Sequence, residues 1–259
     1  MDNPSPTAKP RPRGIYLLPN LFTSGALFAG FYAIIAASQA RFSDACIAVF
    51  IAAVLDGLDG RVARLTGTQS DFGVQYDSLS DLISFGMAPA LVMYHWALSE
   101  LRFDGTTAGK IGWSAAFLYA ACAALRLARF NTQVGVVDKR WFIGLASPAA
   151  AAVMMSFIWT LDSHLNLSGG QVRWIALGIT VTTGLLMVSR IRYFSFKSLP
   201  FGGRVPFVTV LLALGLLVLL AIDTARVLFV ASTVYLLSGP LAWVWGRLRR
   251  ERRPPAAAG

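Results

Sequence analysis

Charged residues are scarce in this chain: only 14% of its 259 residues are Asp, Glu, Lys or Arg, and 56% are hydrophobic. Soluble domains carry about a quarter charged residues, so this shortage argues against an ordinary soluble protein and indicates an integral membrane one. Cysteine and histidine are also rare. Cys46 and Cys122 fall inside apolar runs as packing residues and predict no disulfide or metal site. His95 and His164 lack a partner at ligand spacing, and we expect them at the membrane interface.

Long apolar runs take the place of the missing charge, and each is long enough to cross a ~30 Å hydrocarbon core as a helix. The predicted fold is all-α, a polytopic transmembrane bundle with a six-helix catalytic core and two C-terminal helices. The eight candidate spans are residues 17–38, 44–64, 77–98, 113–130, 141–161, 173–190, 206–222 and 226–246. Residues 1–14 are predicted to be a cytoplasmic tail and not a signal peptide, 15–246 the membrane domain, and 247–259 a basic cytoplasmic tail.

The basic residues are distributed unevenly between the two sides of this topology. With the N-terminus inside, 18 of the 23 Lys and Arg residues lie on the inner side and 5 on the outer. The positive-inside rule then places both termini in the cytoplasm. The protein is predicted to be integral to the inner (cytoplasmic) membrane. The net charge of +10 is explained by topology and anionic lipid and predicts no nucleic-acid partner.

Acidic residues gather in one place: five of the 13 fall between Asp56 and Asp81. Asp56 and Asp59, near the inner end of the second span, lie about 60° apart on one helix face. Asp77 and Asp81, at the start of the third span, lie about 40° apart. The segment LTGTQSD (65–71) between the two pairs is typical of a turn. The two spans therefore form a predicted hairpin that brings the carboxylates face to face.

Four facing carboxylates would repel one another unless a cation neutralised them. Oxygen ligands without His or Cys suit Mg²⁺ or Mn²⁺, as one ion or two. Such ions clamp phosphoryl oxygens, so a phosphate-bearing substrate is implied. The structural alternative is that these are helix-end acids at the interface, with Asp71 and Asp77 favoured by the helix dipole. Asp71 lies off the two paired faces, so we interpret it as a helix-end acid and not as a metal ligand.

The residues between the acids support a ligand site. Gly60 and Gly73 leave the backbone open to a ligand, and Ala63 keeps the same face shallow. Arg64 can pair with a phosphate or a base edge. Ser70 places a short hydroxyl in the turn, within reach of a phosphate oxygen.

The pattern D-x2-D-G-x2-A-R-x8-G-x3-D-x3-D, from Asp56 to Asp81, resembles without a gap the signature of the CDP-alcohol phosphatidyltransferases. The resemblance implies a helical membrane enzyme that displaces CMP from a CDP-linked lipid with an alcohol. It implies that Asp56, Asp59, Asp77 and Asp81 hold two divalent ions, and that Asp81 is also the base for the incoming hydroxyl.

The same resemblance implies which residues bind the CDP-lipid. Gly60, Arg64 and Ser70 correspond to contacts with the CDP moiety, and Ala63 and Gly73 belong to the same set. Asn20 and Thr23, in LLPNLFTSG, match the PNxxT element that approaches the diphosphate.

Four further segments, DSLSDLISFGMAP, ALRLARFNT, GLASPAAAA and SRIRYFSFK, look like the integral-membrane phosphatidylserine synthases of this family. That likeness implies CDP-diacylglycerol and L-serine as substrates, direct transfer in phospholipid biosynthesis, and a homodimer. Ala146 departs from the proline usual in the third segment. A serine carboxylate needs a cation, so Arg126, Arg129 and Asn131 are predicted to bind it, with Ser84 and Phe85 lining the pocket. Positive-inside charge and core packing are the alternatives for these residues.

Other functions remain open at this point. The same chemistry on glycerol 3-phosphate or inositol phosphate would need a denser basic pocket than Arg126 and Arg129 supply. An intramembrane prenyltransferase also holds diphosphate through Mg²⁺ and aspartates, but its motifs lie far apart in the chain. A cation transporter would carry its acids near the bilayer midplane, and these acids lie at one end.

Overall fold

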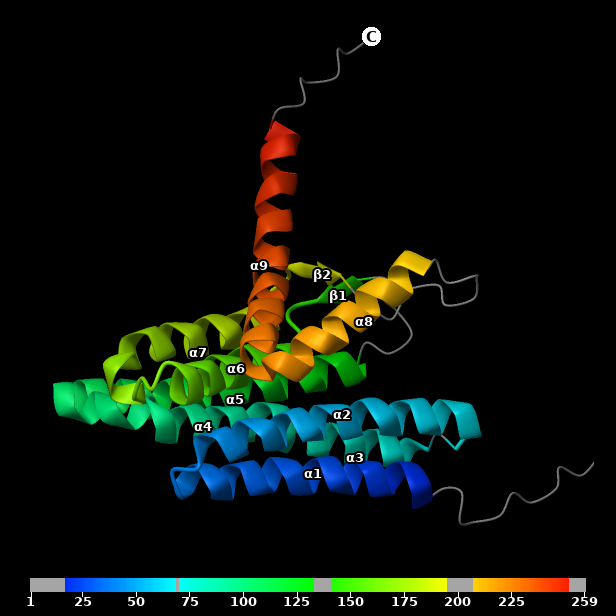
Figure 1. The fold of residues 1–259 in the computed structure, drawn as a ribbon, viewed down its shortest axis with the longest axis horizontal. Coiled ribbons are helices and arrows are strands. Elements are labelled where there is room, and N and C mark those ends of the chain that lie inside the picture. Colours follow the sequence, from blue (N-terminus) through cyan, green and yellow to red (C-terminus); the bar gives the residue numbers. More distant parts are fainter. Residues whose placement is uncertain (1–16, 69, 133–140, 195–206, 252–259) are drawn as a thin grey trace, which may run out of the picture.

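The computed structural model describes residues 17–68, 70–132, 141–194 and 207–251. The predicted N-terminal tail, and residues 252–259 of the predicted C-terminal tail, lie outside these ranges. Helices account for most of the described chain, so the predicted helical class is confirmed. Helices α1 to α7 run alongside one another, and α9 extends away from them (Figure 1).

The first hairpin consists of α1 (Leu17–Ser38) and α2 (Phe42–Thr66). Most of its buried residues are alanine: Ala26, Ala29, Ala33, Ala36 and Ala37 on α1, and Ala45, Ala48 and Ala52 on α2. Small residues let helices approach closely in lipid, where apolar burial alone gives little attraction. Helix α2 ends at Gly67, whose positive φ of 61° forms a left-handed cap that donates its N–H to the Ala63 carbonyl.

The next helical stretch is continuous but not uniform. It consists of α3 (Asp71–Asp81), a π-helical segment η2 (Leu82–Met87) and α4 (Ala88–Trp96). Pro89 has no N–H to offer the Phe85 carbonyl four residues earlier. The hydroxyl of Tyr119, on α5, donates to that carbonyl instead at 3.1 Å. A buried tyrosine therefore holds this irregular segment against the neighbouring helix.

The middle of the chain adds three long helices: α5 (Thr106–Thr132), α6 (Ser147–His164) and α7 (Arg173–Val188). Two short 3₁₀ helices, η3 (Leu98–Asp104) and η4 (Gly169–Gln171), connect α4 to α5 and α6 to α7. A Cβ at Gly112 would run into the Leu98 backbone, and one at Gly169 would run into Trp96. These two glycines therefore allow the close packing around these connections.

Two three-residue strands were not predicted. β1 (Trp141–Ile143) and β2 (Arg192–Phe194) pair antiparallel, with Phe142 opposite Tyr193. The predicted span 141–161 was therefore wrong at its start, because α6 begins only at Ser147.

The late start of α6 has a backbone cause. Gly144, at φ 81°, turns the chain and donates its N–H to the Ile191 carbonyl at 2.8 Å. Leu145 donates to the Leu186 carbonyl at 3.0 Å. These bonds hold the approach to α6 against the end of α7. Ala146, at φ −65°, precedes the helix with a backbone angle that proline also adopts.

The C-terminal part consists of α8 (Phe207–Ile222) and α9 (Thr224–Glu251), with Pro240 inside α9. The corner between them lies near His164, whose Nε2 is 3.2 Å from Asp223. Arg226 pairs with the same carboxylate at 3.2 Å.

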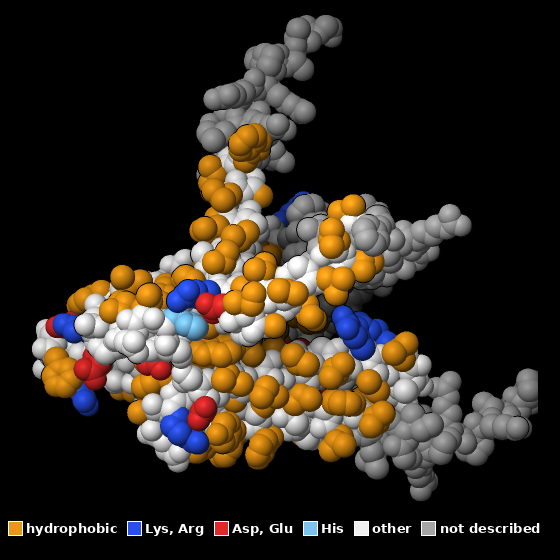
Figure 2. Space-filling view, in the orientation of Figure 1, with side chains coloured by type: hydrophobic (Ala, Val, Ile, Leu, Met, Phe, Trp, Pro, Cys, Tyr) orange, Lys and Arg blue, Asp and Glu red, His pale blue; other side chains and the backbone are white. Residues whose placement is uncertain are grey.

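Within the described residues, four helical stretches are long and apolar enough to cross a membrane: Leu18–Ser38, Asp71–Asp104, Thr106–Thr132 and Thr224–Trp245. Helices Arg173–Val188 and Val208–Ile222 are apolar but shorter. Apolar side chains are spread over much of the surface seen in Figure 2, and charged side chains form a few separate groups. The chain is therefore an integral membrane protein, and the predicted total of eight spans stays a prediction.

Candidate active site

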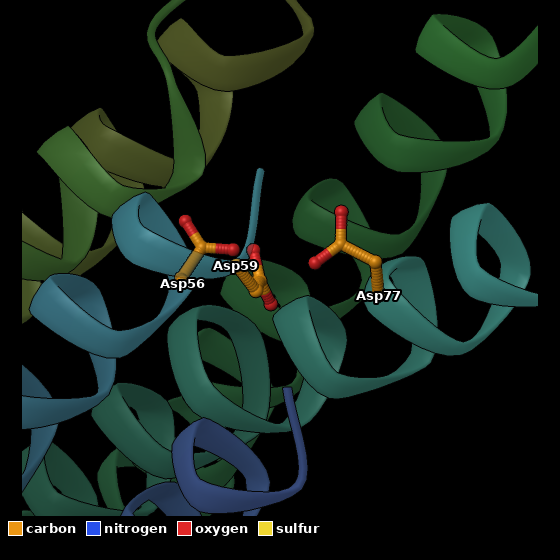
Figure 3. Close-up of side chains that lie close together, drawn as sticks. All are labelled: Asp56, Asp59 and Asp77. Carbon is orange, nitrogen blue, oxygen red and sulfur yellow. The ribbon is translucent and has the colours of Figure 1, made fainter. Parts of the chain in front are cut away.

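Three of the four predicted acids meet at one end of the bundle. Asp56 and Asp59 come from the C-terminal part of α2 and Asp77 from α3, and their carboxylates point toward a common space (Figure 3). Each offers an oxygen, and these oxygens all lie within 4.8 Å of one another. The predicted hairpin therefore produces the predicted cluster.

Asp59 is the most buried member of the cluster, with 5% of its surface exposed. Its Oδ2 accepts a hydrogen bond from Thr23 Oγ1 at 2.7 Å. Ser80, on α3, donates to the Thr23 carbonyl at 3.1 Å. Helix α1 thus fixes the orientation of Asp59 and joins α2 to α3 below the cluster. A hydrogen-bonded partner behind a carboxylate is the arrangement that orients a metal ligand.

Asp81 lies outside this group of three but next to it. Its electrostatic neighbours are the carboxyls of Asp56 and Asp77 and the guanidinium of Arg126. Two carboxyl groups this close need a proton or a cation between them. The donor set is entirely carboxylate oxygen, which fits Mg²⁺ or Mn²⁺. All four predicted acids therefore belong to one electrostatic unit.

The turn before α3 forms a second part of the site. Ser70 Oγ caps the helix by accepting the Gly73 N–H at 3.1 Å. A Cβ at Gly73 would lie 3.2 Å from Ser70 Oγ and 3.6 Å from Asn20 Oδ1. Glycine at position 73 therefore lets the capped turn approach the start of α1. Asn20, Ser70 and Gly73, three of the predicted CDP-lipid residues, are thus neighbours.

Gly60 differs from Gly73 because packing within the chain does not require it. It is exposed, and a Cβ built there would meet no atom within 4 Å. A helical glycine costs about 1 kcal/mol relative to alanine, so an open one needs another reason. Ala63 is partly buried and Arg64 is exposed on the following turn. This shallow face leaves room for a ligand beside the acids.

The predicted acceptor residues divide into two groups. Arg126 Nη1 donates to Ser147 Oγ at 2.7 Å, and Asn131 Nδ2 donates to Ser78 Oγ at 3.0 Å. Asn131 therefore joins the end of α5 to α3 beside Asp77, and Arg126 joins α5 to the start of α6. Arg129, one turn from Arg126, is partly buried.

Ser84 and Phe85 lie deeper in the bundle. Ser84 Oγ donates to the Ala26 carbonyl at 3.0 Å, and both side chains are buried. A Cβ at Gly30 would lie 2.6 Å from Ser84 Oγ, so this contact between η2 and α1 is very close. The structure thus gives both residues packing contacts, and their role in the acceptor pocket stays a prediction.

Comparison with known families agrees with this geometry. Residues 16–186 match the family model of CDP-alcohol phosphatidyltransferase, a range that contains all four acids, Arg126 and Ser147. The chain belongs to this family. CDP-alcohol phosphatidyltransferases are generally dependent on divalent metal ions, and the cluster of Asp56, Asp59 and Asp77 could hold such an ion.

Curated CDP-alcohol phosphatidyltransferases extend the similarity beyond the matched range. A CDP-diacylglycerol–serine O-phosphatidyltransferase of Helicobacter pylori is 38% identical over 89% of this chain and 92% of its own length. One from Mycobacterium leprae is 37% identical over 71% of this chain and 61% of that protein. An archaetidylserine synthase of Methanothermobacter thermautotrophicus is 35% identical over 68% of this chain and 69% of its own length.

Two residues near the site of this CDP-alcohol phosphatidyltransferase were missed by sequence reasoning. Ser147 holds Arg126 through the 2.7 Å bond, and Tyr235, on α9, is an electrostatic neighbour of the same guanidinium. Ser147 directly precedes Pro148 at the start of α6. This Ser-Pro pair was a local sign of a helix start with a polar side chain. Tyr235 lies in an apolar span far along the chain, where spacing gives no indication of its neighbours.

Proposed function

We propose that this enzyme transfers the phosphatidyl group of CDP-diacylglycerol to the hydroxyl of L-serine, giving phosphatidylserine and CMP. The observation that carries the proposal is the position of Arg126, a partly buried cation that is an electrostatic neighbour of Asp81. A serine carboxylate bound to Arg126 would bring the serine hydroxyl toward Asp81. The relatives from H. pylori and M. leprae, named for serine transfer, support the same acceptor.

The reaction follows from the roles of these residues. Asp81 accepts the proton of the serine hydroxyl, and the serine oxygen forms a bond to the phosphorus that carries diacylglycerol. The bond from that phosphorus to the bridging oxygen breaks, and CMP leaves with the electron pair. Asp56, Asp59 and Asp77 would hold the divalent ions, which when bound neutralise charge on the diphosphate. Asn20, Ser70 and the open backbone at Gly60 line the CDP side.

The remaining predictions concern the setting of the reaction. We place the site on the cytoplasmic side of the inner membrane with both termini, as the 18:5 distribution of basic residues indicates. Two ions and a homodimer remain proposals that rest on the family resemblance.

An acceptor assay tests the proposed function directly. Purified protein in detergent is given CDP-diacylglycerol, Mg²⁺ or Mn²⁺, and one of three acceptors: serine, glycerol 3-phosphate or inositol phosphate. We expect CMP release with serine, and phosphatidylserine as the labelled product. A phosphate dianion asks for more positive charge than Arg126 and Arg129 provide. Release only with a phosphorylated acceptor would overturn serine as the substrate.

Replacing Gly60 with alanine tests the CDP-lipid face. The added methyl enters the space reserved for ligand, so we expect the KM for CDP-diacylglycerol to rise about tenfold. Helix stability should not fall, because alanine favours the helix by about 1 kcal/mol. Gly178→Ala is the matched control: this glycine, on α7, is also exposed with no atom near its Cβ position. Equal KM values for the two variants would contradict a ligand role for Gly60.

A further inference from the structure

The first residue of α6 uses its side chain for a neighbouring helix. Ser147 begins α6 and is fully buried. A serine at a helix start ordinarily caps the backbone N–H groups of the first turn. Here the N-cap is Ala146, which has no polar side chain. The Ser147 hydroxyl instead accepts a hydrogen bond of 2.7 Å from Arg126 Nη1, on α5.

The backbone before Ser147 gives this hydroxyl a fixed position. Gly144 donates its N–H to the Ile191 carbonyl at 2.8 Å. Leu145, which is fully buried, donates to the Leu186 carbonyl at 3.0 Å. A Cβ at Gly144 would run into the backbone of α7, so the two segments are in direct contact. The end of α7 therefore holds the start of α6, and with it the side chain that contacts Arg126.

This partner holds Arg126 without cancelling its charge. No ion pair joins Arg126 to a described residue, although Asp81 is one of its electrostatic neighbours. A carboxylate in place of Ser147 would neutralise the guanidinium, whereas a hydroxyl accepts one N–H and leaves the positive charge in place. Arg126 is thus held as a cation whose charge can still meet an anionic ligand.

Arg126 also has unused hydrogen-bonding capacity. Its Nε is buried and has no hydrogen-bond partner among the described residues. A buried donor without an acceptor costs free energy, so such a donor is expected to meet a ligand. The guanidinium is a rigid planar fork, so fixing Nη1 limits the directions in which its other N–H groups point.

We propose that Ser147 is a positioning residue for acceptor binding, because it orients the Arg126 guanidinium toward the anionic group of the acceptor. Under the proposed function, on which this inference rests, that group is the carboxylate of serine. Ser147 acts through Arg126 and does not touch the acceptor itself. The neutral hydroxyl also favours a singly charged acceptor, since one uncancelled positive charge matches one carboxylate.

The first test compares Ser147→Ala with wild type in detergent. We expect the KM for the acceptor to rise about tenfold, the effect of losing one hydrogen bond to a charged group. The kcat and the KM for CDP-diacylglycerol should change little, because the lost bond orients a group that binds only the acceptor.

Ser156→Ala is the matched control for this variant. Ser156 lies on the same helix, is also fully buried, and shares a hydrogen bond of 3.0 Å with Ser232. Both variants lose a buried serine hydrogen bond, so both can lower the melting temperature. Only Ser147→Ala should raise the acceptor KM. An equal acceptor KM in the two variants would overturn the positioning role.

A double-mutant cycle shows whether Ser147 acts through Arg126. Arg126→Lys keeps the positive charge, but lysine ends one bond short of Nη1 and lacks the planar fork. In that background we expect Ser147→Ala to change the acceptor KM by less than about twofold, because the group that it positions is gone. A second tenfold rise would show that Ser147 acts independently of Arg126 and would contradict the proposal.

The order of the measurements separates this inference from the proposed function. Wild-type enzyme is first given serine, glycerol 3-phosphate and inositol phosphate, and every variant is then measured with the acceptor that it uses. Use of a phosphorylated acceptor would overturn serine transfer, and the KM of Ser147→Ala for that acceptor would still decide the role of Ser147.

Discussion

Replacing Asp81 with asparagine is expected to lower the rate of CMP release about a thousandfold, while binding of CDP-diacylglycerol is largely retained. Asparagine keeps the shape of the side chain but cannot accept the serine proton, and general-base catalysis contributes about 10²–10⁴-fold. The three clustered acids, which would hold the metal at the diphosphate, are untouched. Single-turnover CMP release and equilibrium binding of CDP-diacylglycerol separate the two effects.

Asp71→Asn provides the control for this variant. Asp71 occupies the first turn of the same helix, α3, where its charge favours the helix dipole. We expect it to cost no more than a small loss of stability, with CMP release close to wild type. If Asp81→Asn kept more than a tenth of wild-type turnover, Asp81 would not be the base. A transporter, by contrast, would retain partial ion flux in that variant.

Replacing Asp59 with asparagine is expected to reduce activity at least about a hundredfold and to raise the Mg²⁺ or Mn²⁺ concentration needed for half-maximal activity. Mutating a residue that only hydrogen-bonds to a metal ligand lowers metal affinity about 10–100-fold. Mutating a ligand itself should lower the affinity at least as much. Asp59 is held by Thr23 Oγ1 at 2.7 Å, and asparagine can keep that bond through its carbonyl oxygen. The fold should therefore survive the change.

Metal titrations of CMP release and Mn²⁺ binding followed by electron paramagnetic resonance measure this second effect. The control is Asp44→Asn, on the same helix, α2, where Asp44 is half-exposed and pairs with Arg41 at 3.5 Å. That surface pair contributes little, so its loss should leave the metal requirement unchanged. An Asp59→Asn protein with the wild-type metal requirement would contradict the metal role of Asp59.

Local spacing was enough to predict the acidic part of the site. Asp56 and Asp59 are three residues apart and Asp77 and Asp81 four, so helical geometry alone puts each pair on one face. A short polar turn between the two helices then brings the pairs together. These relations depend on residues close in sequence, where periodicity is reliable.

The acceptor side depends on contacts that spacing does not encode. Arg126 was predicted from its charge, but its hydrogen-bond partner Ser147 lies on another helix, which reaches it only in the folded bundle. Strand β1 was read as part of the apolar span 141–161, since short apolar runs do not distinguish a strand from a helix, and β2 fell in the predicted loop after the span 173–190. Gly144, whose positive φ ends that run, carried the correct signal.

The direction in which Asp77 and Asp81 point depends on the number of residues in the π-helical segment Leu82–Met87, and not on which side chains it carries. An i→i+5 segment holds more residues per turn than an α-helix. Deleting one residue there would turn Asp77 and Asp81 by about 100° relative to α4, whose buried face is fixed by packing. Substitutions in η2 leave this angle unchanged, but insertions and deletions do not. The spacing between Asp81 and Pro89 is thus a dimension of the active site, although no residue within it is a metal ligand.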